Sequence, residues 1–192
     1  MSNASHSRNM SAPSAIERLR EGNQRYVAAL TSWTDVCPAL RALTARHGQE
    51  PYAIVITCSD SRVIPEAIFS ASIGDLFVIR VAGNVIDDHQ LGSIEYAASH
   101  LGVNLVLVLG HTHCGAVGAA MGEDAHGYIK YVVDDIKQAI GDETDDREAC
   151  RLNVEHSMDV IESSLEIQKE ETQGMVVRGA IYDIASGVVD FL

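Results

Sequence analysis

The chain has 192 residues, of which 46% are hydrophobic and 21% are charged. This length suits one domain with a sizeable core, and the composition excludes intrinsic disorder as the overall state. The formal net charge of -13 would repel a nucleic-acid backbone or an anionic membrane surface, so neither is an expected partner. No apolar run approaches the roughly 20 residues that span a bilayer, and no secretory signal is visible. We therefore expect a cytoplasmic protein.

In the first half of the chain, the sequence predicts one helix followed by two buried strands. Residues 1–12, rich in Ser and Asn, predict a disordered leader, and residues 13–192 predict a single domain. Ser14 and Glu17 are spaced as a capping box, which predicts a helix that continues to about Leu30. Short apolar runs rich in β-branched residues predict buried strands at residues 52–57 and 76–80.

The second half alternates helical and strand patterns. Helical spacing of apolar residues predicts helices over residues 90–101, 124–140 and 146–170, and strongly apolar residues 104–109 predict a third strand. On the last helix, an apolar stripe is expected to face the core or a subunit interface; it comprises Val154, Met158, Ile161 and Leu165. Residues 175–184 and 188–192 predict a hairpin. The fold class is therefore α/β, with a mostly parallel central sheet flanked by helices and a C-terminal strand hairpin at the sheet edge.

The four cysteines do not form the spacing pattern of a disulfide framework. Cys37 and Cys150 have no ligand-type neighbours at useful spacing, and we interpret both as buried free cysteines. Cys58 and Cys114 instead lie in polar segments that follow predicted strands, where a role in metal binding or catalysis is the better explanation.

Two segments carry the chemistry, CSDSR at residues 58–62 and GHTHCG at residues 110–115. Ligands bind at the carboxyl ends of parallel strands, so both segments are expected to meet in one crevice. Thiolate and imidazole together suit Zn²⁺. His111 and Cys114 are three residues apart on a turn entering a helix and can share one ion, whereas His113 and Cys114 diverge. With Cys58 the set is Cys₂His, which leaves a fourth position open, as in catalytic rather than structural zinc sites.

Asp60 has two possible roles. It lies two residues from Cys58 and can become a fourth ligand that closes the site. It also lies two residues from Arg62, which can hold it as a bidentate ion pair. In that pair the carboxylate stays ionised and can accept a hydrogen bond from zinc-bound hydroxide.

The motifs CSDSRV and GHTHCGAV, each after a strand and in this order, resemble those of the β-class carbonic anhydrases. The similarity extends from about Ala15 to Leu192 and includes RVAGNVI at residues 80–86 and IEYA at residues 94–97. The resemblance implies reversible hydration of CO₂ to bicarbonate and a proton, by an intimate dimer that often pairs further into a tetramer. It also implies the site residues: Cys58, His111 and Cys114 as zinc ligands, with Asp60 and Arg62 as the catalytic dyad.

Further residues match family positions outside the two motifs. Gln49, nine residues before the first ligand, matches the substrate-binding Gln of the plant-like branch. The allosteric branch carries Trp where this chain has Val55, so the pattern resembles the plant-like branch with an open zinc site. Phe77 and Tyr96 match aromatic residues that line the cleft between subunits, and His100 matches a proposed proton-shuttle position.

Two alternative functions are compatible with the same residues. Similar scaffolds can hydrolyse carbon disulfide or carbonyl sulfide, so one alternative is a hydrolase of these sulfur analogues of CO₂. Alternatively, the protein is a non-catalytic zinc- or bicarbonate-binding protein, although such a protein would be expected to have lost Asp60 or Arg62, and both are present.

Overall fold

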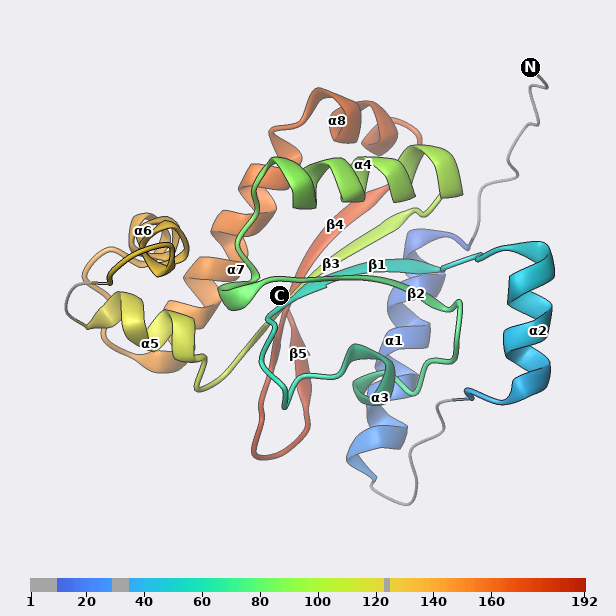
Figure 1. The fold of residues 1–192 in the computed structure, drawn as a ribbon, viewed down its shortest axis with the longest axis horizontal. Coiled ribbons are helices and arrows are strands. Elements are labelled where there is room, and N and C mark those ends of the chain that lie inside the picture. Colours follow the sequence, from blue (N-terminus) through green and yellow to red (C-terminus); the bar gives the residue numbers. More distant parts are fainter. Residues whose placement is uncertain (1–9, 29–34, 123–124) are drawn as a thin grey trace.

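The computed structural model describes residues 10–28, 35–122 and 125–192. It confirms the α/β fold class: a single sheet has the strand order β2-β1-β3-β4-β5 (Figure 1). All neighbours are parallel except the final pair, β4 and β5, which is antiparallel and forms the expected hairpin at the sheet edge. The strands are β1 (Ala53–Thr57), β2 (Leu76–Arg80), β3 (Leu105–His111), β4 (Val176–Tyr182) and β5 (Val189–Phe191).

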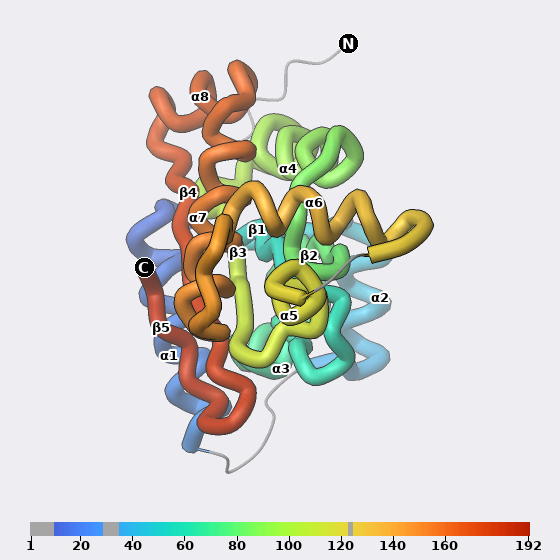
Figure 2. The backbone as a smooth tube through the Cα atoms, turned by 90° about the vertical axis from the view of Figure 1, so that its left-hand side faces the viewer, coloured from blue at the N-terminus to red at the C-terminus, as the bar shows by residue number. Residues whose placement is uncertain are grey.

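Helices cover both faces of the sheet. One face packs against α1 and α3, and the other against α4, α5, α6 and α7. Figure 2 shows α5 and α6 on the side facing the viewer, while α2 stands at the opposite side of the molecule and buries no residue. The helices are α1 (Ala12–Val27), α2 (Pro38–His47), α3 (Pro65–Ile68), α4 (Asp88–Leu101), α5 (Gly115–Met121), α6 (Ile129–Ile140), α7 (Asp146–Glu162) and α8 (Leu165–Glu171), with a 3-10 turn, η1, at Ala82–Asn84.

The central strands are apolar on both sides because both faces of the sheet are covered. Every residue of β1 is buried, and its side chains alternate between the two cores. Ile54 and Ile56 join the cluster under α4 to α7, whereas Ala53 and Val55 join the cluster under α1. By contrast, β2 lies at an edge, and its residues are only half-buried or exposed.

Several local expectations were wrong. The first helix is capped by Ser11, whose hydroxyl accepts from the Ser14 N–H, and the expected end near Leu30 falls outside the described residues. The long final helix is interrupted after Glu162 and restarts beyond Ser164, which caps α8. Leu165 therefore leaves the apolar stripe and is 81% exposed.

Cys37 is exposed rather than buried, because it caps α2 with its sulfur, which accepts from the Leu40 N–H. Cys150 is buried, as expected. Most of the expected leader, residues 1–9, lies outside the described residues. The helix expected from residue 124 begins only at Ile129, because residues 125–128 are not helical and Gly127 has φ of 61°. Within the described part of the chain, no helix combines the length and apolar character that a membrane crossing requires.

Gly179 of β4 lies where α7 packs closely on the sheet. A Cβ atom there would stand 2.8 Å from Val154 Cγ1 and 2.9 Å from Met158 Sδ. We predict that Gly179→Ala lowers the free energy of unfolding by about 1–3 kcal/mol through overpacking, measured by denaturant unfolding.

Gly92→Ala is the matched control, since Gly92 is exposed within α4 and a Cβ there meets nothing within 4 Å. Its helix propensity should raise stability by up to about 1 kcal/mol. Equal effects of the two substitutions would contradict the packing argument.

Candidate metal centre

The strand order creates one crevice at the carboxyl ends of β1 and β3. The connection after β1 leads to β2 on one side, and the connection after β3 leads to β4 on the other. Such a divergence is where open α/β sheets bind ligands. Thr57, the last residue of β1, pairs with Leu109 and donates its hydroxyl to the Leu109 carbonyl at 2.7 Å. The segments that follow, 58–62 and 111–115, therefore lie side by side.

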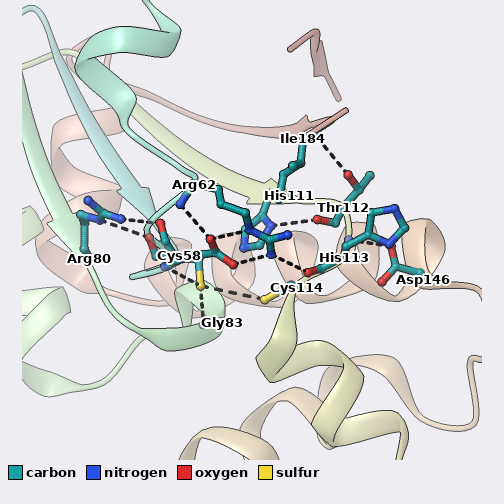
Figure 3. Close-up of polar contacts among 11 residues, drawn as sticks. Cys58, Arg62, Arg80, Gly83, His111, Thr112, His113, Cys114, Asp146 and Ile184 are labelled. Atoms are coloured by element: carbon teal, nitrogen blue, oxygen red, sulfur yellow. Dashed lines mark hydrogen bonds and ion pairs between the residues drawn. The ribbon is translucent and has the colours of Figure 1, made fainter. Parts of the chain in front are cut away.

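Cys58, His111 and Cys114 meet in this crevice, as the sequence predicts (Figure 3). One ligand atom from each lies within 4.8 Å of the others, and the two sulfurs are 3.9 Å apart. All three side chains are buried, with at most 5% of any residue exposed. Among the described residues, no carboxylate joins this group. These three residues can hold one four-coordinate metal ion and leave its fourth coordination position open.

The hydrogen bonding of the His111 ring leaves one of its nitrogens free to bind a metal. His111 Nδ1 lies 3.0 Å from the Thr112 carbonyl, which can only accept, so Nδ1 carries the proton. Nε2 then presents a lone pair, and it is the one buried side-chain nitrogen or oxygen in the described residues that lacks a hydrogen-bond partner. A buried nitrogen without a hydrogen-bond partner, close to two sulfurs, fits a cation such as Zn²⁺, and a backbone carbonyl is a usual partner of the other ring nitrogen of a metal-binding histidine.

The two thiols of the metal group differ in acidity. The contact with Cys114 is the main cause that lowers the pKa of the Cys58 thiol well below its usual range, against the opposing effect of burial. Backbone N–H groups of Gly83 and Asp60, at 3.3 and 3.4 Å from Cys58 Sγ, act in the same direction. The same sulfur contact, together with burial, raises the pKa of Cys114. A bound cation would stabilise both as thiolates.

Asp60 is held away from the three ligands by Arg62. The guanidinium donates from Nε to Oδ1 at 2.9 Å and from Nη2 to Oδ2 at 2.7 Å, and the Arg62 backbone N–H adds a bond to Oδ1 at 2.9 Å. These bonds hold the pKa of the Asp60 carboxyl below its usual range, although partial burial opposes them. The carboxylate therefore stays ionised at neutral pH, beside the metal group but outside it.

Residues to which the sequence assigned no role in the site also fix these loops. Arg80 donates to the carbonyls of Cys58 and Asp60, at 3.2 and 2.7 Å. His113, in a left-handed conformation with φ of 56°, donates its backbone N–H to Asp146 at 2.8 Å, and its carbonyl accepts from Arg62. The imidazole of His113 takes no part in the metal group. The RVAGN segment was the available signal for Arg80.

The remaining expected site residues lie elsewhere in this single chain. Gln49 is exposed and precedes the amino end of β1, whereas the metal group follows its carboxyl end. Phe77 lies on the edge strand β2, with its ring centroid 6.3 Å from that of Tyr96. Tyr96, 48% exposed, stacks on His100 at 5.1 Å. These three rings form one cluster at the β2 edge.

Comparison with known proteins agrees with this geometry. The family model for carbonic anhydrases matches residues 53–189, a range that contains all three candidate ligands and the Asp60–Arg62 pair. Solved structures of β-carbonic anhydrases share the fold, including CafA of Aspergillus fumigatus, with a TM-score of 0.74 and 31% identity over 81% of each chain. The chain belongs to the β-carbonic anhydrase family. Two tetrameric β-carbonic anhydrases of Sordaria macrospora were also solved; the match has a TM-score of 0.73 and 27% identity, over 81% of this chain and 87% of the other.

Curated relatives of this chain are named carbonic anhydrases. Carbonic anhydrase 2 of Mycobacterium tuberculosis is 43% identical over 137 residues, and the carbonic anhydrase of Mycolicibacterium smegmatis is 40% identical over 137 residues. Each match covers 69% of this chain and 66% of the relative, so this chain spans slightly less than two thirds of those proteins.

We predict that His111→Ala loses the bound metal, because three ligands become two. The measurement is metal content per chain after dialysis, by elemental analysis. His113→Asn is the control: Asn tolerates the left-handed conformation of this residue, and the exposed imidazole lies outside the metal group. An unchanged metal content in His111→Ala would refute the ligand assignment, as would its loss in His113→Asn.

Proposed function

We propose that the protein catalyses the reversible hydration of CO₂ to bicarbonate and a proton, with Zn²⁺ held by Cys58, His111 and Cys114. The observation that carries this proposal is the convergence of these three buried ligands beside an ionised carboxylate that is not among them. Zn²⁺ with an open position lowers the pKa of a coordinated water toward neutrality and so supplies a nucleophile.

In this proposal Asp60 orients the attacking water. Its carboxylate has no proton to give at neutral pH, because Arg62 lowers its pKa. It therefore acts as a hydrogen-bond acceptor and turns an oxygen lone pair toward CO₂. Arg62 is a positioning residue, since its guanidinium touches both carboxylate oxygens and not the metal group.

The same bonds support an open-site enzyme of the plant-like kind. For Asp60 to become the fourth ligand, it would have to break two charged hydrogen bonds to Arg62. Val55 stands where the allosteric branch carries Trp, and it is fully buried in β1. We therefore propose that Asp60 stays with Arg62 at neutral pH.

We propose that the protein self-associates as a dimer or tetramer, with Gln49, Phe77 and Tyr96 serving a neighbouring subunit. The support is the half-buried apolar edge strand β2 and the cluster of Phe77, Tyr96 and His100 beside it. In this arrangement the Gln49 amide would bind substrate oxygens, and His100 would carry protons from the neighbour's site. The solved Sordaria macrospora relatives are described as tetrameric.

We further propose one catalytic domain over residues 13–192 and a cytoplasmic location. All four cysteines are free thiols in the structure, and two of them belong to the metal group. A reducing compartment keeps such thiols available for metal.

We predict that Asp60→Asn retains zinc but loses about 10²- to 10⁴-fold in kcat/KM for CO₂ hydration, because the amide replaces the ionised acceptor. Stopped-flow measurement of CO₂ hydration, together with metal analysis, checks this. Zinc binding in the wild type without CO₂ hydration would favour a non-catalytic protein, and faster turnover of carbon disulfide would favour the hydrolase.

The role of Gln49 across the subunit boundary gives a separate prediction. Cys58→Ser and Gln49→Ala homo-oligomers should both have little activity, the first for want of metal and the second for want of the amide. Mixed oligomers of the two chains should regain activity, because the metal-bearing chain then receives Gln49 from its partner. No recovery in co-expressed, co-purified mixtures would mean that Gln49 does not act in trans.

A further inference from the structure

The 3-10 turn η1, which comes from neither metal-binding segment, contacts a candidate ligand. The Gly83 N–H donates to Cys58 Sγ at 3.3 Å (Figure 3). Hydrogen bonds to a ligand sulfur orient it and tune its donation to a metal, and loss of such partners weakens metal binding. The position of Gly83 therefore helps to orient the sulfur of Cys58.

The turn has a conformation that needs outside support. Gly83 has φ of 66°, and the next residue, Asn84, has φ of 47° although it has a side chain. Asn enters this region more readily than most residues with a side chain, but usually as a single residue, so two left-handed residues in succession depend on contacts that hold them. Space is also tight, since a Cβ on Gly83 would stand 2.6 Å from Ile136 Cδ1 and 3.1 Å from Ala116 Cβ.

Helix α7 supplies that support through two polar side chains on its buried face. Asn153 donates from Nδ2 to the Gly83 carbonyl at 2.7 Å. Ser157, one helical turn later, lies 3.1 Å from the Asn84 carbonyl and 3.4 Å from Asn84 Nδ2. Asn153 and Ser157 are each 1% exposed. Burying a polar side chain costs free energy unless it is hydrogen-bonded. The burial of Asn153 and Ser157 therefore indicates that their hydrogen bonds to η1 have a structural role.

We propose that Asn153 is a positioning residue for the metal centre: it fixes the Gly83 carbonyl, and thereby holds the Gly83 N–H on Cys58 Sγ. It touches neither the metal group nor Asp60, and it acts only through η1. This proposal rests on the proposed function, since it takes Cys58 to be a zinc ligand.

Two substitutions at Asn153 test it. Asn153→Asp keeps the shape but sets a carboxylate oxygen, which accepts, against the Gly83 carbonyl, and Asn153→Leu removes the hydrogen bond with a side chain of similar size. Each is expected to weaken zinc binding about tenfold, measured by competition with a chromophoric chelator. Leu serves if the Asp variant fails to fold.

The matched control is Val154→Ala, the next residue of the same helix. Val154 is fully buried, and its side chain lies at Gly110 and Gly179, not at η1. This substitution lowers stability by opening a cavity but leaves the Asn153–Gly83 bond in place. Its zinc affinity should stay within about twofold of wild type.

The Co²⁺-substituted protein gives a readout that stability alone does not move. Loss of the N–H bond makes the Cys58 thiolate easier to oxidise, so the thiolate-to-Co²⁺ charge-transfer band should shift to lower energy in both Asn153 variants but not in Val154→Ala. An unmoved band, or equal effects in Val154→Ala, would overturn the inference. A wild-type protein that binds Co²⁺ without any thiolate band would instead overturn the proposed ligand set.

Discussion

The parallel pairing of β1 with β3 is the constraint on which the metal centre depends. The register runs from Ile54 with Val106 to Thr57 with Leu109, and the Thr57 hydroxyl adds a bond to the neighbouring strand at its end. Cys58 then leaves β1 while β3 continues to His111. A slip of one residue would exchange the faces of a strand that is buried on both sides. The same packing that stabilises the core therefore sets the separation of the ligands.

The site places negatively charged groups in the interior of a protein that already has a net charge of -13. Cys58 and Cys114 belong to an apolar cluster, where an uncompensated thiolate would be costly. Short-range compensation comes from backbone N–H groups of Gly83 and Asp60, while the carboxylate of Asp60 is balanced by Arg62. Because these donors are held by fixed backbone and by a bidentate pair, little rearrangement is needed when charge changes at the centre.

The sequence was sufficient for the parts of the fold and site that follow local rules. Apolar runs predicted all four parallel strands, and the rule that ligands gather at strand ends predicted that Cys58 would meet His111 and Cys114. Residue spacing predicted the ion pair of Asp60 with Arg62, which the structure confirms, and the resemblance added their role as a catalytic dyad. Roles drawn from the family for Gln49, Phe77, Tyr96 and His100 stay predictions, because they concern a neighbouring subunit.

The missed features depend on competition between nearby residues or on distant contacts. Ser11 and Ser14 both suit a helix cap, and Pro13 near the helix start accompanies the earlier one. Cys37 looked apolar by residue type, but its place before Pro38 made it a cap. Asn153 is 70 residues from Gly83, so no local pattern joins them. The available signal was a pair of polar residues, Asn153 and Ser157, on the apolar face of a helix.

The two sulfur ligands lie 56 residues apart in the chain, and this separation gives the metal a second consequence. Only the folded protein offers the three donors together, so under the proposed assignment an ion binds the native state far better than the unfolded one. By mass action, free ion at about 100 times its dissociation constant adds about 2.7 kcal/mol to the stability of a protein. The heat resistance of this chain, and its lifetime among proteases, would then rise and fall with the zinc supply of the cell.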